Sequence, residues 1–294
     1  MKFVAITGGL GNQMFIYAFC EELRSRGEEA NLLIQYKKNA KKYGHQGYEL
    51  EKLFSIKPYE SKPIFSFFVK WYGRFIRIFP VKMRVLLFRL IRMENRLVDE
   101  NFIYYPEVFQ SISKNEIFRG TWQSELYFKN STLQIRNIFE FNESLMNIQT
   151  KNLANKMHQE TSISIHIRRG DYLSSKYING FSGICTLDYY KAAIEIINSR
   201  FIDGSFYIFT DDQEWVNENF QLENSLCVQH NTGSDSWQDM YLMSRCKHNI
   251  IANSSFSWWG AWLNNNPDKI VIAPKYWWNG LDNDDVVPKN WLRI

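Results

Sequence analysis

The 294-residue sequence lacks any apolar run of the roughly 18 or more residues that a transmembrane helix needs. Lys2 is followed by only four apolar residues before Gly8-Gly9, which is too short for the apolar core of a signal peptide. The four cysteines form no Cys-x-x-Cys pair, and we expect them to stay reduced. These absences predict a cytoplasmic protein, with any membrane contact being peripheral.

Several catalytic patterns are missing as well. The five histidines lie far apart without a His-Glu-x-x-His spacing, which argues against a zinc hydrolase. Neither a Gly-x-Ser-x-Gly elbow nor a Gly-x-x-x-x-Gly-Lys phosphate loop occurs. The Asp-x-Asp at 282–284 follows no predicted strand, so we interpret it as a solvated turn. We therefore expect no metal site and no bound cofactor.

The charge of the chain is small but unevenly placed. With 45% hydrophobic and 22% charged residues, the chain can bury a core. Its 35 basic and 31 acidic residues nearly balance, which does not indicate nucleic-acid binding. Residues 62–92 nevertheless hold eight cations and no acid, interleaved with aromatic side chains and split by Pro80. This basic insert predicts a helical pair. This helical pair would bind a lipid-linked acceptor or the anionic inner face of a membrane. The alternative is that its arginines are only solvated.

The pattern of strands and helices indicates a parallel α/β protein. Residues 1–35 predict a strand at Phe3–Thr7, a helix from about Asn12 to Arg26 and a second strand from Leu32. From Ser162 onwards, apolar strands alternate with helices, which is typical of parallel βαβ units. The polar stretch 142–160 is the strongest boundary candidate, so we expect lobes of 1–150 and 151–294. The later strands are expected at 162–168, 206–210, 226–229, 249–252 and 269–273, and the helices at 186–200, 213–219, 235–245 and 256–264.

Polar side chains follow three of these predicted strands. Because the carboxyl ends of parallel strands meet at one sheet edge, these side chains should lie together and line a ligand site. Arginine can clamp diphosphate oxygens, and hydroxyls and helix N-termini can add donors, so the pattern predicts a nucleotide site. Each cluster also has an ordinary structural explanation. His166 fits a core histidine, the adjacent arginines fit a solvated turn, and Asp211-Asp212 fits a helix cap. The clusters are His166, Arg168, Arg169 and Asp171; Thr210, Asp211 and Asp212; and Asn253, Ser254 and Ser255.

The glycine-rich turn at residues 8–11 is a second candidate site. It lacks the third glycine of a dinucleotide fingerprint, and the next strand ends without an acidic residue for a ribose. Its bare N–H groups, with Asn12 and Gln13, suit an anion or a sugar at the interface between two lobes. The alternative is a tight turn that serves close packing.

Four segments together resemble the α-1,2-fucosyltransferase family in its bacterial form. They are GGLGNQMF at 8–15, HIRRGDY at 166–172, FTDD at 209–212 and NSSFSWWGAW at 253–262, in the order found in the family. The blocks at 166–172 and 253–262 do not occur together by chance, so the match is specific. Animal members carry an N-terminal membrane anchor that this sequence lacks, which favours the bacterial cytoplasmic form.

The resemblance implies a GT-B-like α/β fold with two Rossmann-like lobes, whose parallel sheets face a cleft. Residues 1–150 would form the acceptor lobe, with a basic aromatic helical insert at 60–96. Residues 151–294 would bind GDP-fucose, with the last residues crossing back. The implied reaction transfers L-fucose from GDP-β-L-fucose to the 2-OH of a terminal β-galactoside, with inversion and without a metal. The alternatives are a nucleotide-sugar-binding module, a fucosyltransferase of another linkage, and a membrane or anionic-polymer binder driven by residues 62–92.

The resemblance also implies roles for individual residues. Arg168 would stabilise the leaving diphosphate, and Asn12 would face the reaction centre. Asp171 is a candidate base by residue type, although two preceding arginines should hold it ionised. His166 and one of the two aspartates, Asp211 or Asp212, would lie at the guanosine. One of the two serines, Ser254 or Ser255, would hold phosphate oxygens. The donor-binding set is His166, Arg169, Asp211, Asp212, Asn253, Ser254, Ser255, Gly9, Gly11 and Gln13.

Overall fold

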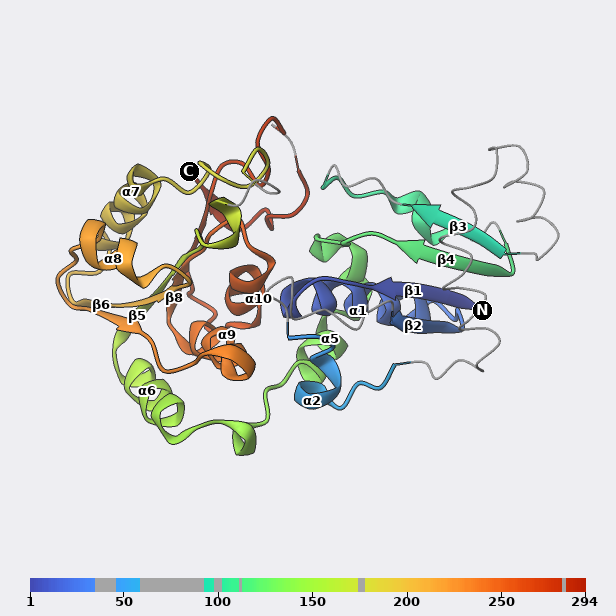
Figure 1. Cartoon of the computed structure of the whole chain (residues 1–294), viewed down its shortest axis with the longest axis horizontal. Helices are drawn as coiled ribbons and strands as arrows, with labels where there is room; N and C mark the ends of the chain where they lie inside the picture. The colour runs from blue at the N-terminus through green and yellow to red at the C-terminus, as the bar shows by residue number, and fades with distance from the viewer. Residues whose placement is uncertain (35–45, 59–92, 98–101, 111–112, 174–177, 282–283) are drawn as a thin grey trace. The chain divides into compact units, whose positions relative to one another are not determined.

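The computed structural model describes residues 1–34, 46–58, 93–97, 102–110, 113–173, 178–281 and 284–294. The chain divides into two compact units, Met1–Glu140 and Phe141–Ile294 (Figure 1). Each unit is built on a parallel sheet flanked by helices, which confirms the predicted α/β class with two parallel sheets. No helix within the described ranges is long and apolar enough to cross a membrane. The four cysteines are free thiols.

The first unit begins with the predicted strand–helix–strand. Helix α1 (Leu10–Ser25) follows strand β1 (Lys2–Ile6) and precedes β2 (Ala30–Ile34), and Gly27 turns the chain with a φ of +83°. The sheet order is β2-β1-β4-β3, with β3 at Met93–Leu97 and β4 at Asn115–Arg119. The other elements are α2 (Leu50–Phe54), the 3-10 helices η3 (Pro106–Phe109) and η4 (Glu125–Ser131), and α5 (Thr132–Ile138).

The basic insert predicted at 60–96 lies almost wholly outside the described residues. Its last residues, 93–96, belong to strand β3 and pair in parallel with β4, so the helical prediction is wrong there. These residues extend the first sheet because β4 offers them a pairing edge. The contact of residues 62–92 with a membrane or a lipid-linked acceptor stays a prediction.

The second unit carries a larger sheet in the order β10-β9-β8-β5-β6-β7. All five predicted strands and all four predicted helices are confirmed, with ends shifted by up to two residues. The chain end is different: Leu292–Arg293 form strand β10 against β9, so the expectation that the last residues cross back is wrong. The elements are β5 (Thr161–Ile167), the 3-10 helix η6 (Asp171–Leu173), α7 (Leu187–Asn198), β6 (Gly204–Thr210), α8 (Gln213–Asn219), β7 (Ser225–Val228), η7 (Gly233–Asp235), α9 (Trp237–Arg245), β8 (His248–Ile250), α10 (Ser255–Leu263) and β9 (Val271–Ala273).

The polar stretch expected to separate the lobes is a helix of the second unit. After the 3-10 turn η5 (Glu143–Leu145), α6 runs from Ile148 to Gln159, and the Asn147 side chain caps it by accepting from the Thr150 N–H at 2.7 Å. The helix packs on α9 and β5, and Phe141 stacks on Trp237 with ring centroids 5.8 Å apart. The boundary therefore follows Glu140 instead of residue 150.

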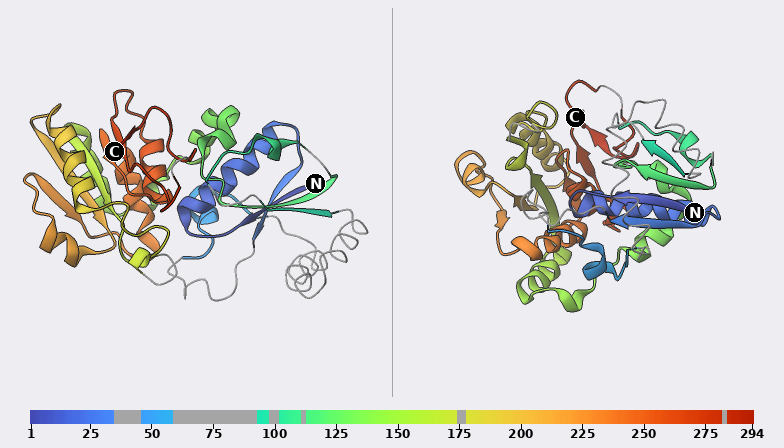
Figure 2. Two further views of the ribbon diagram at one scale, coloured as in Figure 1. Left: turned by 90° about the horizontal axis from the view of Figure 1, so that it is seen from above. Right: turned by 45° about the vertical axis from the view of Figure 1, so that its right-hand side comes forward.

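Strand β5 is buried on both faces, and its two faces differ in chemistry. Ile163, Ile165 and Ile167 pack in one apolar cluster with residues of α7 and α8. Ser162 and Ser164 alternate with them on the other face. There Ser162 Oγ donates to the Met157 carbonyl of α6, and Ser164 Oγ accepts from Asn249 Nδ2 of the neighbouring strand β8. Figure 2 shows helices on both sides of this sheet. The alternation directs the next polar residue, His166, towards α10.

Candidate active site

The three predicted polar clusters lie at neighbouring strand ends of the second unit. Strand β5 pairs with β6 on one side and with β8 on the other, because the chain builds β6 and β7 outwards before it returns to β8. In open α/β sheets, ligands bind at such a reversal of strand order, beyond the carboxyl ends. Arg168–Arg169, Asp211–Asp212 and Asn253–Ser255 follow β5, β6 and β8. The structure thus gathers these candidates at one edge of the second sheet.

Two arginine–aspartate pairs join the ends of β5 and β6. Arg168 Nη1 lies 3.2 Å from Asp211 Oδ2, and Arg169 Nε lies 3.2 Å from Asp212 Oδ2. The other oxygen of each carboxylate is also occupied: Asp211 Oδ1 accepts from the Arg169 N–H at 2.9 Å, and Asp212 Oδ1 caps α8 by accepting from the Trp215 N–H at 3.1 Å. Both aspartates therefore hold arginines in place. Their contact with guanosine stays a prediction.

Each guanidinium also lies over an aromatic ring. The Arg169 guanidinium carbon is 4.2 Å from the centroid of the Trp215 ring, and that of Arg168 is 5.8 Å from the Tyr172 ring. Gly170 lies between these contacts, and a Cβ there would come within 2.9 Å of Asp211 Oδ2. A side chain at this position would require the Asp211 carboxylate to shift. The side chains of Arg168 and Arg169 remain about one-third exposed, at 32% and 31%.

His166 lies buried beneath this cluster, with its ring 5.9 Å from that of Phe256 in α10. Burial lowers its pKa from 6.5 to about 3, and Arg168 lowers it further, while Asp211 acts in the opposite direction. The imidazole is therefore neutral at physiological pH. Within the described ranges its Nδ1 has no hydrogen-bond partner, which suits a ligand contact and also a core histidine. Its predicted role at the guanosine stays a prediction.

Asn253 uses its side chain to join two loops. Its Nδ2 donates to the Phe181 carbonyl at 3.1 Å and to the Trp277 carbonyl at 3.3 Å, while its own carbonyl accepts from the Tyr172 hydroxyl at 2.9 Å. The following Ser254 is also buried, and its Oγ caps α10 by accepting from the Phe256 N–H at 3.3 Å. Ser255 is more exposed than either. Asn253 and Ser254 thus shape the edge that Ser255 and the arginines offer to a ligand.

Two further residues predicted to be catalytic are Asp171 and Asn12. Asp171 begins η6 after the β5 end, but its side chain lies outside the described part of the structure, so its role as a base stays a prediction. Asn12 belongs to the first unit, where its Oδ1 accepts from Gln123 Nε2 at 2.8 Å. It is partly exposed on the first turn of α1.

The glycine-rich turn of the first unit is braced by Gln13. This fully buried side chain donates from Nε2 to the Gly8 and Gly47 carbonyls at 3.0 and 2.7 Å, and its Oε1 accepts from the Glu49 N–H at 3.0 Å. Gly9 is the N-cap of α1 and Gly11 is buried inside it. Gln13 therefore positions the turn, while donor contacts by Gly9, Gly11 and Gln13 stay predictions.

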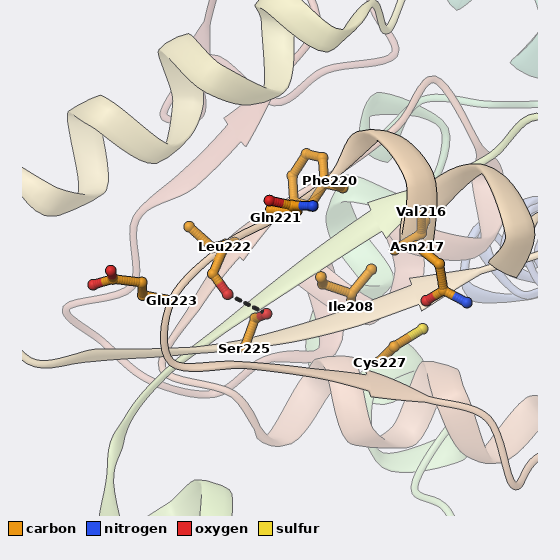
Figure 3. Close-up of a pocket in the computed structure, with 9 residues that line it drawn as sticks. All are labelled: Ile208, Val216, Asn217, Phe220, Gln221, Leu222, Glu223, Ser225 and Cys227. Atoms are coloured by element: carbon orange, nitrogen blue, oxygen red, sulfur yellow. Dashed lines mark hydrogen bonds between the residues drawn. The ribbon is translucent and has the colours of Figure 1, made fainter.

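A groove of about 590 Å³ lies elsewhere in the second unit, between α8 and β7 (Figure 3). Val216, Phe220 and Cys227 are among its lining residues, and the Ser225 hydroxyl closes a loop by donating to the Leu222 carbonyl at 2.6 Å. The described lining includes none of the predicted site residues. The groove is therefore not the site that the sequence predicts.

A polar network follows the end of strand β7. Asn231 Oδ1 accepts from Asn147 Nδ2 at 2.9 Å and from the Thr150 hydroxyl at 3.1 Å, and its Nδ2 donates to Asp239 Oδ1 at 2.8 Å. Burial raises the pKa of Asp239 from 3.8 to about 7, although the Asn231 hydrogen bond opposes the rise. The network fixes α6 and α9 to the end of the sheet.

The raised pKa of Asp239 predicts a decline in stability between about pH 4 and 7. The folded protein keeps the proton in this range while the unfolded chain loses it, so the free energy of unfolding falls as the pH rises. Asp239→Asn should remove this decline. At pH 8 it should be more stable than wild type by roughly 1–3 kcal/mol, since partial exposure reduces the full effect. Urea denaturation at pH 5 and 8 measures it, with exposed Asp235→Asn as control. Equal stability of Asp239→Asn and wild type at pH 8 would contradict the assignment.

The sequence matches the family described as glycosyl transferase family 11 over residues 1–294. It is 36% identical to an α-1,2-colitosyltransferase from Escherichia coli, over 98% of this chain and 97% of that protein. It is 30% identical to the O-antigen biosynthesis glycosyltransferase WbnK from Escherichia coli, over 98% and 99%. It is 24% identical to galactoside α-(1,2)-fucosyltransferase 1 from Lagothrix lagotricha, over 58% and 48%.

Among solved structures, the NodZ α-1,6-fucosyltransferase soaked with GDP-fucose aligns with a TM-score of 0.49 at 15% identity, over 89% of this chain and 92% of that one. The full-length family match and the two relatives that span nearly the whole chain settle the classification. The protein belongs to glycosyltransferase family 11, which confirms the family indicated by its sequence motifs.

Proposed function

We propose that this protein transfers L-fucose from GDP-β-L-fucose to the 2-OH of a terminal β-galactoside, forming an α-1,2 linkage. The observation that carries the proposal is the pair of aspartate-held arginines at the reversal of strand order in a family 11 chain. Two partly exposed guanidinium groups at neighbouring strand ends suit the two phosphates of a nucleoside diphosphate. The α-1,2 linkage is supported by the names of the relatives.

In the proposed reaction, the acceptor oxygen attacks the anomeric carbon from the face opposite the diphosphate, so the β-linked donor gives an α product. Negative charge builds on the diphosphate as its bond to the sugar breaks. Arg168 stabilises that charge without moving, because Asp211 and the Tyr172 ring already hold it in position. The arginines thereby supply positive charge of the kind that a divalent metal supplies in other transferases.

A second donor is favoured by one specific observation, the 36% identity to an α-1,2-colitosyltransferase. Colitose differs from L-fucose by the loss of one hydroxyl group, so the same diphosphate contacts would serve both donors. GDP-colitose is therefore the alternative donor for the proposed transfer.

The test is a transfer assay with the purified protein, lactose or N-acetyllactosamine, and EDTA. GDP-fucose and GDP-colitose are supplied separately, released GDP is measured, and the linkage and anomeric configuration of the product are determined by NMR. We expect an α-1,2-linked product with EDTA present. GDP binding without turnover would instead support a binding module, another linkage would support the alternative fucosyltransferase, and loss of activity in EDTA would contradict metal independence.

A further inference from the structure

We propose that Trp215 of α8 is a positioning residue for donor binding, because its ring holds the Arg169 guanidinium in the orientation that pairs with the diphosphate. This inference rests on the proposed transfer function. It concerns a residue that no motif in the sequence singled out. Every contact that supports it lies within the second unit.

The first turn of α8 places Trp215 beside Arg169. Asp212 is the N-cap of this helix, and its Oδ1 accepts from the Trp215 N–H at 3.1 Å. The other carboxylate oxygen, Oδ2, lies 3.2 Å from Arg169 Nε. The Asp212 N–H donates to the Thr210 hydroxyl at 3.0 Å, which ties the N-cap to the end of β6. One carboxylate therefore joins the helix that carries Trp215 to the arginine that follows β5.

The Trp215 ring restrains the same arginine a second time. The Arg169 guanidinium carbon is 4.2 Å from the ring centroid, within the range of a cation–π contact. The ring is itself restrained, because it packs against the apolar cluster that includes Ile167 and Val216. Core packing thus fixes the ring, and the ring fixes the guanidinium.

Arg169 still has donors left for a ligand. A guanidinium carries five N–H donors, and the Nε–H of Arg169 faces Asp212. Within the part of the chain that the structure describes, its two Nη nitrogens make no hydrogen bond or ion pair. The side chain is 31% exposed, and two such nitrogens can bind two phosphate oxygens in parallel. A restrained cation with open donors at the carboxyl edge of a parallel sheet points to an anionic ligand.

The two restraints on Arg169 differ in their effect on the local charge. Asp212 orients the guanidinium but offsets part of its positive charge, and Asp211 places a second carboxylate at the same edge. An aromatic ring orients a guanidinium without bringing a negative charge. Trp215 therefore holds the arginine still while the edge keeps its attraction for a diphosphate.

This restraint should act on donor affinity more than on the rate of transfer. An unrestrained arginine loses rotamer freedom when it binds a ligand, and that loss weakens binding. With Trp215 in place, much of the loss has occurred before the donor arrives. The diphosphate contacts Arg169 both in the bound donor and in the transition state, so losing the restraint should raise KM and leave kcat nearly unchanged.

Trp215→Leu removes the aromatic face and keeps an apolar side chain on the core. We expect the Kd for GDP, measured by calorimetry, to rise by about 3–10-fold. The KM for the sugar donor should rise in parallel, with kcat within about twofold of wild type. Trp215→Phe keeps a ring and should recover part of the affinity.

The matched control is Phe220→Leu, at the C-terminal cap of the same helix. Phe220 packs in the same apolar cluster, so this variant should lose stability and keep the wild-type Kd for GDP. Urea denaturation of each variant separates a loss of stability from a loss of affinity.

A double-mutant cycle separates positioning from direct contact. Arg169→Gln should itself weaken GDP binding, and adding Trp215→Leu should then have little further effect, because the ring acts through the arginine. If Trp215→Leu weakens GDP binding by the same factor with and without Arg169→Gln, the ring touches the ligand directly and the positioning role is overturned. Unchanged GDP binding by Trp215→Leu alone also overturns it.

Wild-type binding and transfer are measured first, so the two proposals fail in different ways. A wild type that binds no GDP overturns both the proposed function and the role of Trp215. A wild type that binds GDP but makes no glycoside with either donor overturns only the transfer, and the GDP affinities still decide the role of Trp215. An active wild type with unchanged GDP affinity in Trp215→Leu overturns only the positioning role.

Discussion

Arg168→Ala should lower kcat for glycosyl transfer by about 10²–10³-fold, the loss typical of removing one preorganised donor to a developing negative charge. The variant removes the guanidinium that lies 3.2 Å from Asp211 and leaves that carboxylate next to the proposed diphosphate. The remaining negative charge repels the donor, so the apparent affinity for GDP should fall as well. The side chain is 32% exposed, so the fold should survive.

The measurements are steady-state kinetics with GDP-fucose, GDP binding by calorimetry, and circular dichroism. Arg200→Ala is the matched control, because Arg200 is an exposed arginine of the same unit beyond the end of α7. Arg168→Lys keeps the charge but not the two-pronged geometry, and should recover part of the loss. Unchanged transfer by Arg168→Ala would overturn the proposed role of the β5 end in charge stabilisation.

Trp258→Ala should have the largest effect on stability, lowering the free energy of unfolding by about 3–5 kcal/mol. Its ring is fully buried in α10 among Trp259, Trp262 and Trp291, with centroids 5.0–6.0 Å away. The indole Nε1 also donates to the Val286 carbonyl at 2.8 Å. The substitution opens a cavity and leaves that carbonyl without this donor.

Urea denaturation followed by tryptophan fluorescence measures the change. Trp258→Phe keeps most of the packing and loses mainly the hydrogen bond, so it should cost about 1–3 kcal/mol. Ile202→Ala serves as the exposed control, since Ile202 is 95% exposed in the same unit. A wild-type transition for Trp258→Ala would show that the tryptophan cluster of α10 is not a core element.

The second unit could be predicted well because its local patterns agree with its packing. Apolar strands alternate with capped helices from residue 161 onwards, and the tryptophans of α10 have the spacing of a buried face, which the structure confirms. Helix α6 was missed because only Thr150, Ala154 and Met157 are buried along twelve mostly polar residues. Such a short buried stripe is hard to distinguish from a linker.

The details of the candidate site depend on contacts that no local pattern contains. The pairing of Arg168 with Asp211 requires the register of β5 against β6, which places Ile167 beside Thr210. The contact of the Glu49 N–H with Gln13 requires a segment outside any predicted element. The interpretation of Asp284 as part of a solvated turn is wrong for the same reason. Its side chain is only 1% exposed and pairs with Arg293 at 2.6 Å.

The strand order of the second sheet has a consequence for how the protein folds. The arginine–aspartate half of the site joins residues 42 positions apart, as in the contact of Arg169 with Asp211. The serine half depends on β8, whose Asn249 meets Ser164 across 85 positions. Closing the longer loop costs more chain entropy, so the shorter pairing is favoured to form earlier. During synthesis, the residues of the arginine–aspartate half leave the ribosome before those of β8, so the same order is expected for the nascent chain.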